Sequence, residues 1–171
     1  MIQVENRQIS FGKQDAPVKV EVFLNLACPY CASYFGIAED VLPEYIANGQ
    51  VEYIIKHYDK PREMLLIGTL VNTFLDYKNP ERVREIMKEL FETQNQWDVL
   101  NNHEIKNLLT EKYQLKEEPD NIEESLKITA EAIRRNVKMV PTVFINEKEF
   151  QYPREIGGAE LRSEIEAALA Y

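Results

Sequence analysis

Two cysteines separated by two residues, Cys28 and Cys31, are the strongest chemical signal in this chain, and they are its only cysteines. One helical turn between them brings their Cα atoms within the roughly 4.4–6.8 Å that a disulfide tolerates. The enclosed loop is so short that closing it changes the chain entropy little, so the bond can form and break as a redox couple. The spacing therefore predicts thiol–disulfide chemistry.

The residues around this pair indicate which sulfur reacts. Pro29 presets φ for a first helical turn and needs no N–H partner there, and Tyr30 is a bulky neighbour of the sulfurs. Cys28 is thereby predicted at the N-cap and Cys31 one turn inside the helix. Unpaired N–H groups and the helix dipole lower the pKa of the leading cysteine, and the thiolate is the reactive form. We expect Cys28 to be the accessible nucleophile and Cys31 to resolve the mixed disulfide.

A Cys-x-x-Cys pair can also be half of a zinc site. Such a site would have to recruit His57, His103 or carboxylates from distant segments that lack metal-ligand spacing. We therefore expect no metal and no other cofactor. Metal analysis of the reduced protein tests the zinc alternative.

The composition limits the classes of function. The chain has 171 residues, 44% hydrophobic and 29% charged, which is typical of one globular domain or one domain carrying an insertion. A formal charge of −9 argues against a nucleic-acid partner or an anionic membrane surface, because both require a basic face. Neither a secretory signal nor a membrane span is visible. The expected location is cytoplasmic, although an exported protein whose signal has been removed would show the same sequence features.

The elements around the cysteines follow from hydrophobic periodicity. Apolar residues at 18, 20, 22 and 24 predict a strand that starts at an exposed end and finishes buried. A helix follows the cysteines and ends near Asn48-Gly49, and residues 50–58 predict a second strand. A strand–helix–strand crossover normally makes its two strands parallel. The cysteines therefore lie where a strand meets its crossover helix.

Residues 62–137 show only helical periodicity, and strand character returns at 139–146. A hairpin-length turn should join that strand antiparallel to residues 150–152. The last helix of the helical block should bury a stripe made by Ile122, Leu126, Thr129, Ala130, Ile133 and Val137. A closing helix should bury Leu161, Ile165, Ala168 and Leu169.

This arrangement resembles the DsbA-like branch of the thioredoxin superfamily. The residues that carry the resemblance are Gly12, Ala16-Pro17-Val18, Cys28-Pro29-Tyr30-Cys31 and Val140-Pro141-Thr142. It implies an α/β, thioredoxin-like fold, with a central mixed β-sheet flanked by helices and an inserted all-helical domain. Residues 1–61 and 138–171 would form the thioredoxin-like domain, and residues 62–137 the inserted helical domain.

The same resemblance implies a thiol–disulfide oxidoreductase. The two cysteines of Cys28-Pro29-Tyr30-Cys31 would be catalytic, with the two residues between them in support. Pro141 would be a cis-proline facing the dithiol, and the backbone of Val140 would pair with an extended substrate. The implied partners are protein or small-molecule thiols and disulfides, and a redox partner that recycles the enzyme. The DsbA enzyme has a histidine where Tyr30 lies here, so a less strongly oxidising couple is expected.

A second departure concerns proton transfer. Typical members hold a buried acid on the first strand, whereas Val22 occupies that position here and Glu21 points to the other face. Proton transfer to Cys31 would then depend on water, on Lys56 or on His57, although the ordinary place for a histidine is the surface.

Two further functions stay open. Glutathione-dependent isomerases or transferases of a related group have a similar helical insertion but generally lack the second cysteine. A chaperone-like binding module would hold unfolded chains with its helical block, and the dithiol would be secondary. The sequence also leaves open whether the couple acts as an oxidant or a reductant.

Overall fold

The computed structural model describes residues 2–171, so Met1, the first residue of the predicted 1–61 segment, lies outside the described part. Its strands are β1 (Ile9–Phe11), β2 (Val18–Leu24), β3 (Val51–His57), β4 (Thr142–Ile145) and β5 (Lys148–Gln151). Its helices are α1 (Pro29–Ala47), α2 (Leu66–Asn72), α3 (Pro80–Glu92), α4 (Gln94–Trp97), α5 (Asn102–Tyr113), α6 (Asp120–Arg134) and α7 (Gly158–Leu169), with a short 3-10 helix at Glu63–Leu65.

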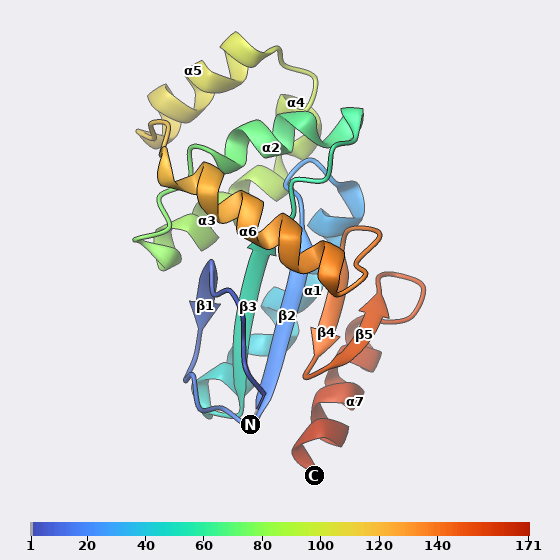
Figure 1. Cartoon of the computed structure of the whole chain (residues 1–171). Coiled ribbons are helices and arrows are strands. Elements are labelled where there is room, and N and C mark those ends of the chain that lie inside the picture. The colour runs from blue at the N-terminus through green and yellow to red at the C-terminus, as the bar shows by residue number, and fades with distance from the viewer. Residues whose placement is uncertain (1) are drawn as a thin grey trace.

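The described strands form one mixed sheet in the order β1-β3-β2-β4-β5 (Figure 1). β2 and β3 are parallel, whereas the β1–β3, β2–β4 and β4–β5 pairs are antiparallel. The predicted crossover, the predicted hairpin and the α/β class are thereby confirmed. β2 is the central strand, so the segment that follows Leu24 lies between the ends of β3 and β4.

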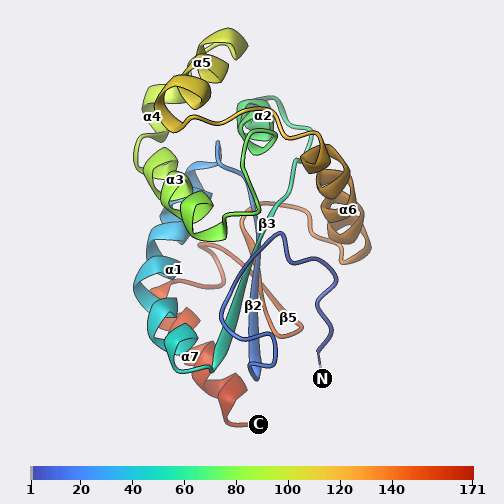
Figure 2. The same ribbon diagram turned by 90° about the vertical axis from the view of Figure 1, so that its left-hand side faces the viewer.

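Helices cover both faces of the sheet. α1 and α7 lie on one face and α6 lies on the other, as the two perpendicular views show (Figures 1 and 2). Val20 and Val22 of β2 are fully buried in the core that includes α1, whereas Phe23 packs with Ile128 of α6. The helices of residues 62–137 are therefore divided, because α2 to α5 gather beyond the end of β2 and β3 while α6 lies on the sheet. The boundaries of the inserted helical domain stay a prediction.

The orientation of α6 shows that the predicted buried stripe is wrong within the helix, although Val137, which lies beyond its end, is buried. Ile122, Leu126 and Ile133 are 59%, 65% and 67% exposed, whereas Glu131 is fully buried. Glu131 follows Ile122 by about two and a half turns, which places the two on opposite sides of the helix. The ammonium of Lys56 reaches Glu131 at 2.9 Å from the sheet below. The face of α6 that carries Glu131 also buries Ile128 and Ala132 against the sheet, and the predicted stripe consequently faces solvent.

β2 also differs from the prediction, because it is buried along its whole length rather than exposed at its start. The ammonium of Lys19 lies 3.0 Å from the carboxylate of Glu52 on β3, and Arg7 reaches the same carboxylate at 2.7 Å. A lysine can be buried when a counter-ion accompanies it. Alternation along one strand cannot reveal a counter-ion that comes from another strand.

Candidate functional site

The cysteines lie where β2 gives way to α1. Cys28 is the N-cap of α1, with φ −87° and ψ 121°, and Pro29 is the first helical residue. The backbone N–H of Cys31 donates a hydrogen bond to the Cys28 sulfur over 3.2 Å. The predicted helical positions of both cysteines are thereby confirmed.

The two sulfurs differ in environment. Cys28 is 6% exposed, less than an accessible nucleophile was expected to be, and Cys31 is 0% exposed. A hydrogen bond from the Cys31 side chain, opposed by burial and assisted by backbone N–H groups of Cys31 and Tyr30, holds the pKa of Cys28 below its ordinary value. Burial, followed by the interaction with Cys28, raises the pKa of Cys31 well above its ordinary value. The leading sulfur is therefore the more acidic and the more reachable of the two.

A second segment faces the dithiol from the start of β4. The Val140–Pro141 peptide bond is cis. The carbonyl oxygen of Val140 lies 3.7 Å from the Cys28 sulfur, and Pro141 is buried beside it. Tyr30, between the cysteines, is 60% exposed. The structure thus brings Cys28, Cys31, Val140 and Pro141 together, with Tyr30 at the rim.

The turn before Cys28 is held by an amide side chain. Asn25 accepts a hydrogen bond from the Ala27 N–H at 2.9 Å and donates one to the Leu65 carbonyl at 3.4 Å. Its own backbone N–H points to the Cys31 sulfur at 3.5 Å. Gly68 of α2 packs directly on this turn, where an added Cβ would lie 2.8 Å from the Ala27 nitrogen. The helical block and the redox turn are therefore in tight contact.

A residue that the sequence analysis missed makes a second such contact. The side-chain amide of Gln94, at the start of α4, donates to the carbonyl oxygens of Leu26 at 2.7 Å and Cys28 at 3.0 Å. Glutamine carries no reactive group, and Gln94 lies 66 positions from Cys28. No local pattern in the sequence could have pointed to it.

The residues considered for proton transfer are engaged elsewhere. Lys56 is fully buried on the α6 side of the sheet, 2.6 Å from Glu21 and 2.9 Å from Glu131. Burial opposes the ionisation of Glu21, but hydrogen bonds from Arg135 and Lys56 outweigh it and lower the pKa of Glu21. Val22 points to the opposite face, in the core shared with α1. The ammonium of Lys56 is therefore committed to two carboxylates.

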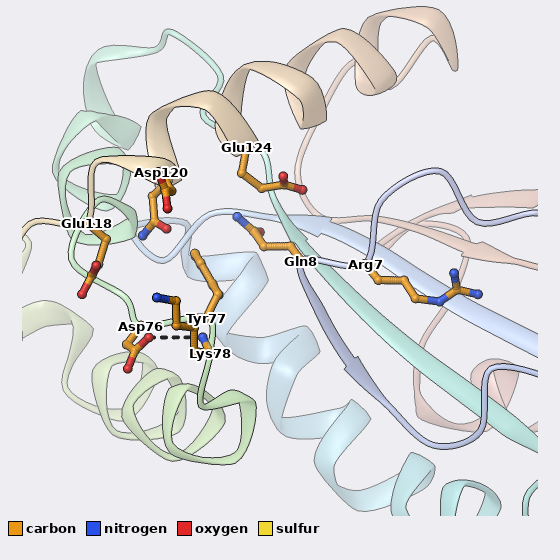
Figure 3. Close-up of a pocket in the computed structure, with 9 residues that line it drawn as sticks. Arg7, Gln8, Asp76, Tyr77, Lys78, Glu118, Asp120 and Glu124 are labelled. Carbon is orange, nitrogen blue, oxygen red and sulfur yellow. Dashed lines mark hydrogen bonds between the residues drawn. The ribbon is translucent and has the colours of Figure 1, made fainter.

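His57 is not the surface histidine expected from the sequence, because it is only 1% exposed. Its Nδ1 lies 2.9 Å from the Tyr77 hydroxyl and 3.1 Å from the Gln8 side-chain oxygen. Burial lowers the pKa of His57 to about 3. Gln8 and Tyr77 in turn line a pocket of about 310 Å³ between β1 and the start of α6 (Figure 3). None of the predicted site residues lines this pocket.

Within residues 2–171, no group of three or more His, Cys, Asp or Glu side chains is placed to hold a metal ion. No helix in this part of the chain has the length and apolar character that a membrane span requires.

Comparisons with known proteins agree with the fold. The thioredoxin family model matches residues 5–167. A conserved protein of unknown function from Enterococcus faecalis V583 is 34% identical, with a TM-score of 0.85 over 92% of this chain and 89% of that chain. The catalytic domain of Proteus mirabilis ScsC is 16% identical, with a TM-score of 0.75 over 98% and 92% of the two chains. Oxidised BdbD from Bacillus subtilis is 18% identical, with a TM-score of 0.62 over 95% and 92%. No curated protein matches the chain.

A central mixed sheet with a Cys-x-x-Cys pair at the start of its crossover helix defines the class as thioredoxin-like. The chain belongs to the thioredoxin family, and it shares its fold with the solved structures of ScsC and BdbD. Because more than nine-tenths of this chain is covered in each of these structures, the helical block is part of the shared fold. Family membership supports thiol–disulfide oxidoreductase chemistry as the class of activity.

Proposed function

We propose that the protein exchanges protein or small-molecule disulfides through Cys28-Pro29-Tyr30-Cys31. The observation that carries this proposal is the 3.2 Å hydrogen bond from the Cys31 N–H to the Cys28 sulfur at the start of α1. It supports a thiolate at Cys28, which is the form that attacks a disulfide. The Val140 carbonyl, 3.7 Å from that sulfur, supports a substrate backbone held beside the reacting atoms.

The exchange then proceeds in two balanced steps. In reduction, the Cys28 thiolate attacks a substrate disulfide, a mixed disulfide forms, and one substrate sulfur leaves as a thiolate that takes up a proton. Cys31 loses its proton to water and attacks the Cys28 sulfur, which closes the Cys28–Cys31 bond and releases the second substrate thiolate. Oxidation of a substrate runs through the same steps in reverse.

The direction of exchange depends on the redox environment in which the protein works. Each turnover changes the oxidation state of the pair, so a redox partner must restore it. A cytoplasmic protein would work against a reducing glutathione pool and would act mainly as a reductant. Equilibration of the pair with glutathione distinguishes a reductant near roughly −270 mV from an oxidant near roughly −120 mV.

Two single substitutions test the mechanism. Cys28→Ser should abolish insulin reduction, whereas Cys31→Ser should accumulate mixed disulfides that appear as a mass increase on non-reducing analysis. Cys28→Ser protein that still reduces insulin would contradict the assignment. The glutathione-dependent alternative would be favoured if Cys31→Ser retained full turnover with glutathione.

A further inference from the structure

We propose that Gln94 is a positioning residue that holds the Cys28 turn in its reactive form, an inference that rests on the proposed function. Gln94 belongs to the helical block, whereas the two carbonyl groups that it binds belong to the turn between β2 and α1. The inserted helices would then help to set the chemistry of the dithiol.

One amide group satisfies both carbonyl oxygens. Nε2 of Gln94 carries two hydrogens, and its acceptors lie at 2.7 Å on Leu26 and 3.0 Å on Cys28. A carboxylate in the same place would have no donor, and an alanine would leave both oxygens without this partner. The paired contact therefore depends on the chemical type of the side chain.

The position of Gln94 is itself fixed by the helical block. Trp97, at the end of α4, is almost fully buried, and its Nε1 donates a hydrogen bond to the Leu90 carbonyl of α3 at 2.8 Å. This anchor holds a helix of only four residues and presents Gln94 toward the redox turn. Displacement of α3 and α4 would therefore be transmitted to the carbonyl of Cys28.

The link between this carbonyl and the sulfur is the ψ angle of Cys28. That angle sets both the direction of the Cys28 carbonyl and the place of the first turn of α1 relative to the Cys28 side chain. A group that fixes the carbonyl thereby also maintains the 3.2 Å hydrogen bond from the Cys31 N–H to the Cys28 sulfur. The Cys28 carbonyl also accepts a hydrogen bond from the Ala32 N–H of α1 at 3.1 Å, so Gln94 is the second of its two donors. Without Gln94 the turn is held less firmly, the bond to the Cys28 sulfur lengthens, and the thiolate loses part of its stabilisation.

The effect on redox behaviour has a definite sign. A stabilised thiolate favours the reduced dithiol over the disulfide, which makes the couple more oxidising. Loss of Gln94 should therefore raise the pKa of Cys28 and shift the glutathione equilibrium toward the Cys28–Cys31 disulfide.

The test compares Gln94→Ala and Gln94→Glu with the matched control Gln96→Ala in the full chain. Gln96 lies two positions further along α4, and its side chain is exposed. The readouts are the pH dependence of alkylation of Cys28 and the equilibrium constant with glutathione. Gln94→Ala should shift both by about threefold to tenfold, and Gln94→Glu by more, because its carboxylate also repels the thiolate. Gln96→Ala should match the wild type.

Thermal unfolding of each variant separates positioning from simple stability. Lower stability of Gln94→Ala with an unchanged alkylation profile would overturn the proposal, and so would equal shifts in Gln94→Ala and Gln96→Ala. Failure of the proposed exchange function would give a different result. The wild-type protein would then have no exchange activity, or the Cys28→Ser variant would still have it.

Discussion

The carbonyl oxygen of Val140 lies 3.7 Å from the sulfur of Cys28, although 112 positions separate the two residues. Strand pairing explains this approach, because Phe23 near the end of β2 is the partner of Thr142 at the start of β4. The segment that follows β2, which contains Cys28, therefore lies beside the segment that precedes β4, which contains Val140. The sheet register, rather than any local motif, joins the two parts of the site.

The order in which the cysteines react is predicted by their opposite pKa shifts. Because the pKa of Cys28 is lowered and that of Cys31 is raised, limited iodoacetamide should label Cys28 first at neutral pH. Peptide mapping across a pH series checks this. Labelling of Cys31 before Cys28 would contradict the proposed roles.

Gly68→Ala should destabilise the protein and disturb the redox turn. The new Cβ would lie 2.8 Å from the Ala27 nitrogen, and overpacking of this kind costs about 1–3 kcal/mol of unfolding free energy. Gly36→Ala in α1 is the matched control, since its added Cβ would meet no atom within 4 Å apart from its chain neighbours and the backbone of its own helix. That change should stabilise the protein by up to about 1 kcal/mol. Urea unfolding measures both, and equal effects would refute the close packing at Gly68.

Lys56→Met should be destabilising because it leaves the buried carboxylates of Glu21 and Glu131 with the Arg135 guanidinium, at 3.0 and 2.8 Å, in place of two cations. Removal of one partner of an isolated buried ion pair costs about 3–5 kcal/mol, and Arg135 should keep the loss near the lower end of that range. Lys127→Met is the control, because Lys127 and Glu123 form an exposed pair at 3.6 Å, and such changes stay within about 0.5 kcal/mol. Similar midpoints for the two variants in urea would show that the buried cluster contributes little.

Acid should destabilise the protein partly through His57. Its folded pKa is about 3, below the unfolded value of about 6.5, so between these values the unfolded chain binds a proton that the folded chain does not. The free energy of unfolding should therefore fall as the pH drops through this window, by up to about 1.4 kcal/mol per pH unit. His57→Gln should flatten this slope in urea unfolding, whereas His103→Gln, at an exposed position, should retain it. An unchanged slope in His57→Gln would exclude this origin.

The elements that local sequence patterns specify were predicted correctly. The β2–α1–β3 crossover, the N-cap position of Cys28 and the antiparallel β4–β5 hairpin each follow from periodicity or turn chemistry over a few residues. The pairing of β2 with β4, which brings Val140 to the dithiol, required the family resemblance because nothing local encodes it.

The incorrect predictions share a cause in long-range polar contacts. Hydrophobic periodicity in α6 favoured the Ile122 stripe as the buried face, but the contact between Glu131 and Lys56, 75 positions apart, rotates the helix the other way. His57 is buried because Tyr77 and Gln8 supply polar partners. Such partners cannot be read from periodicity, because it scores each residue without its counter-ion or hydrogen-bond partner.

The two outer strands of the sheet offer little backbone edge for the addition of another strand. β1 has three residues and β5 has four, and the β5 edge presents the exposed charges of Lys148 and Glu149. Short, charged edge strands are poor templates for the addition of another strand, and they also disfavour self-association. In the proposed exchange reaction, an extended polypeptide substrate would therefore be directed away from the flanks of the sheet and toward the loop that precedes β4.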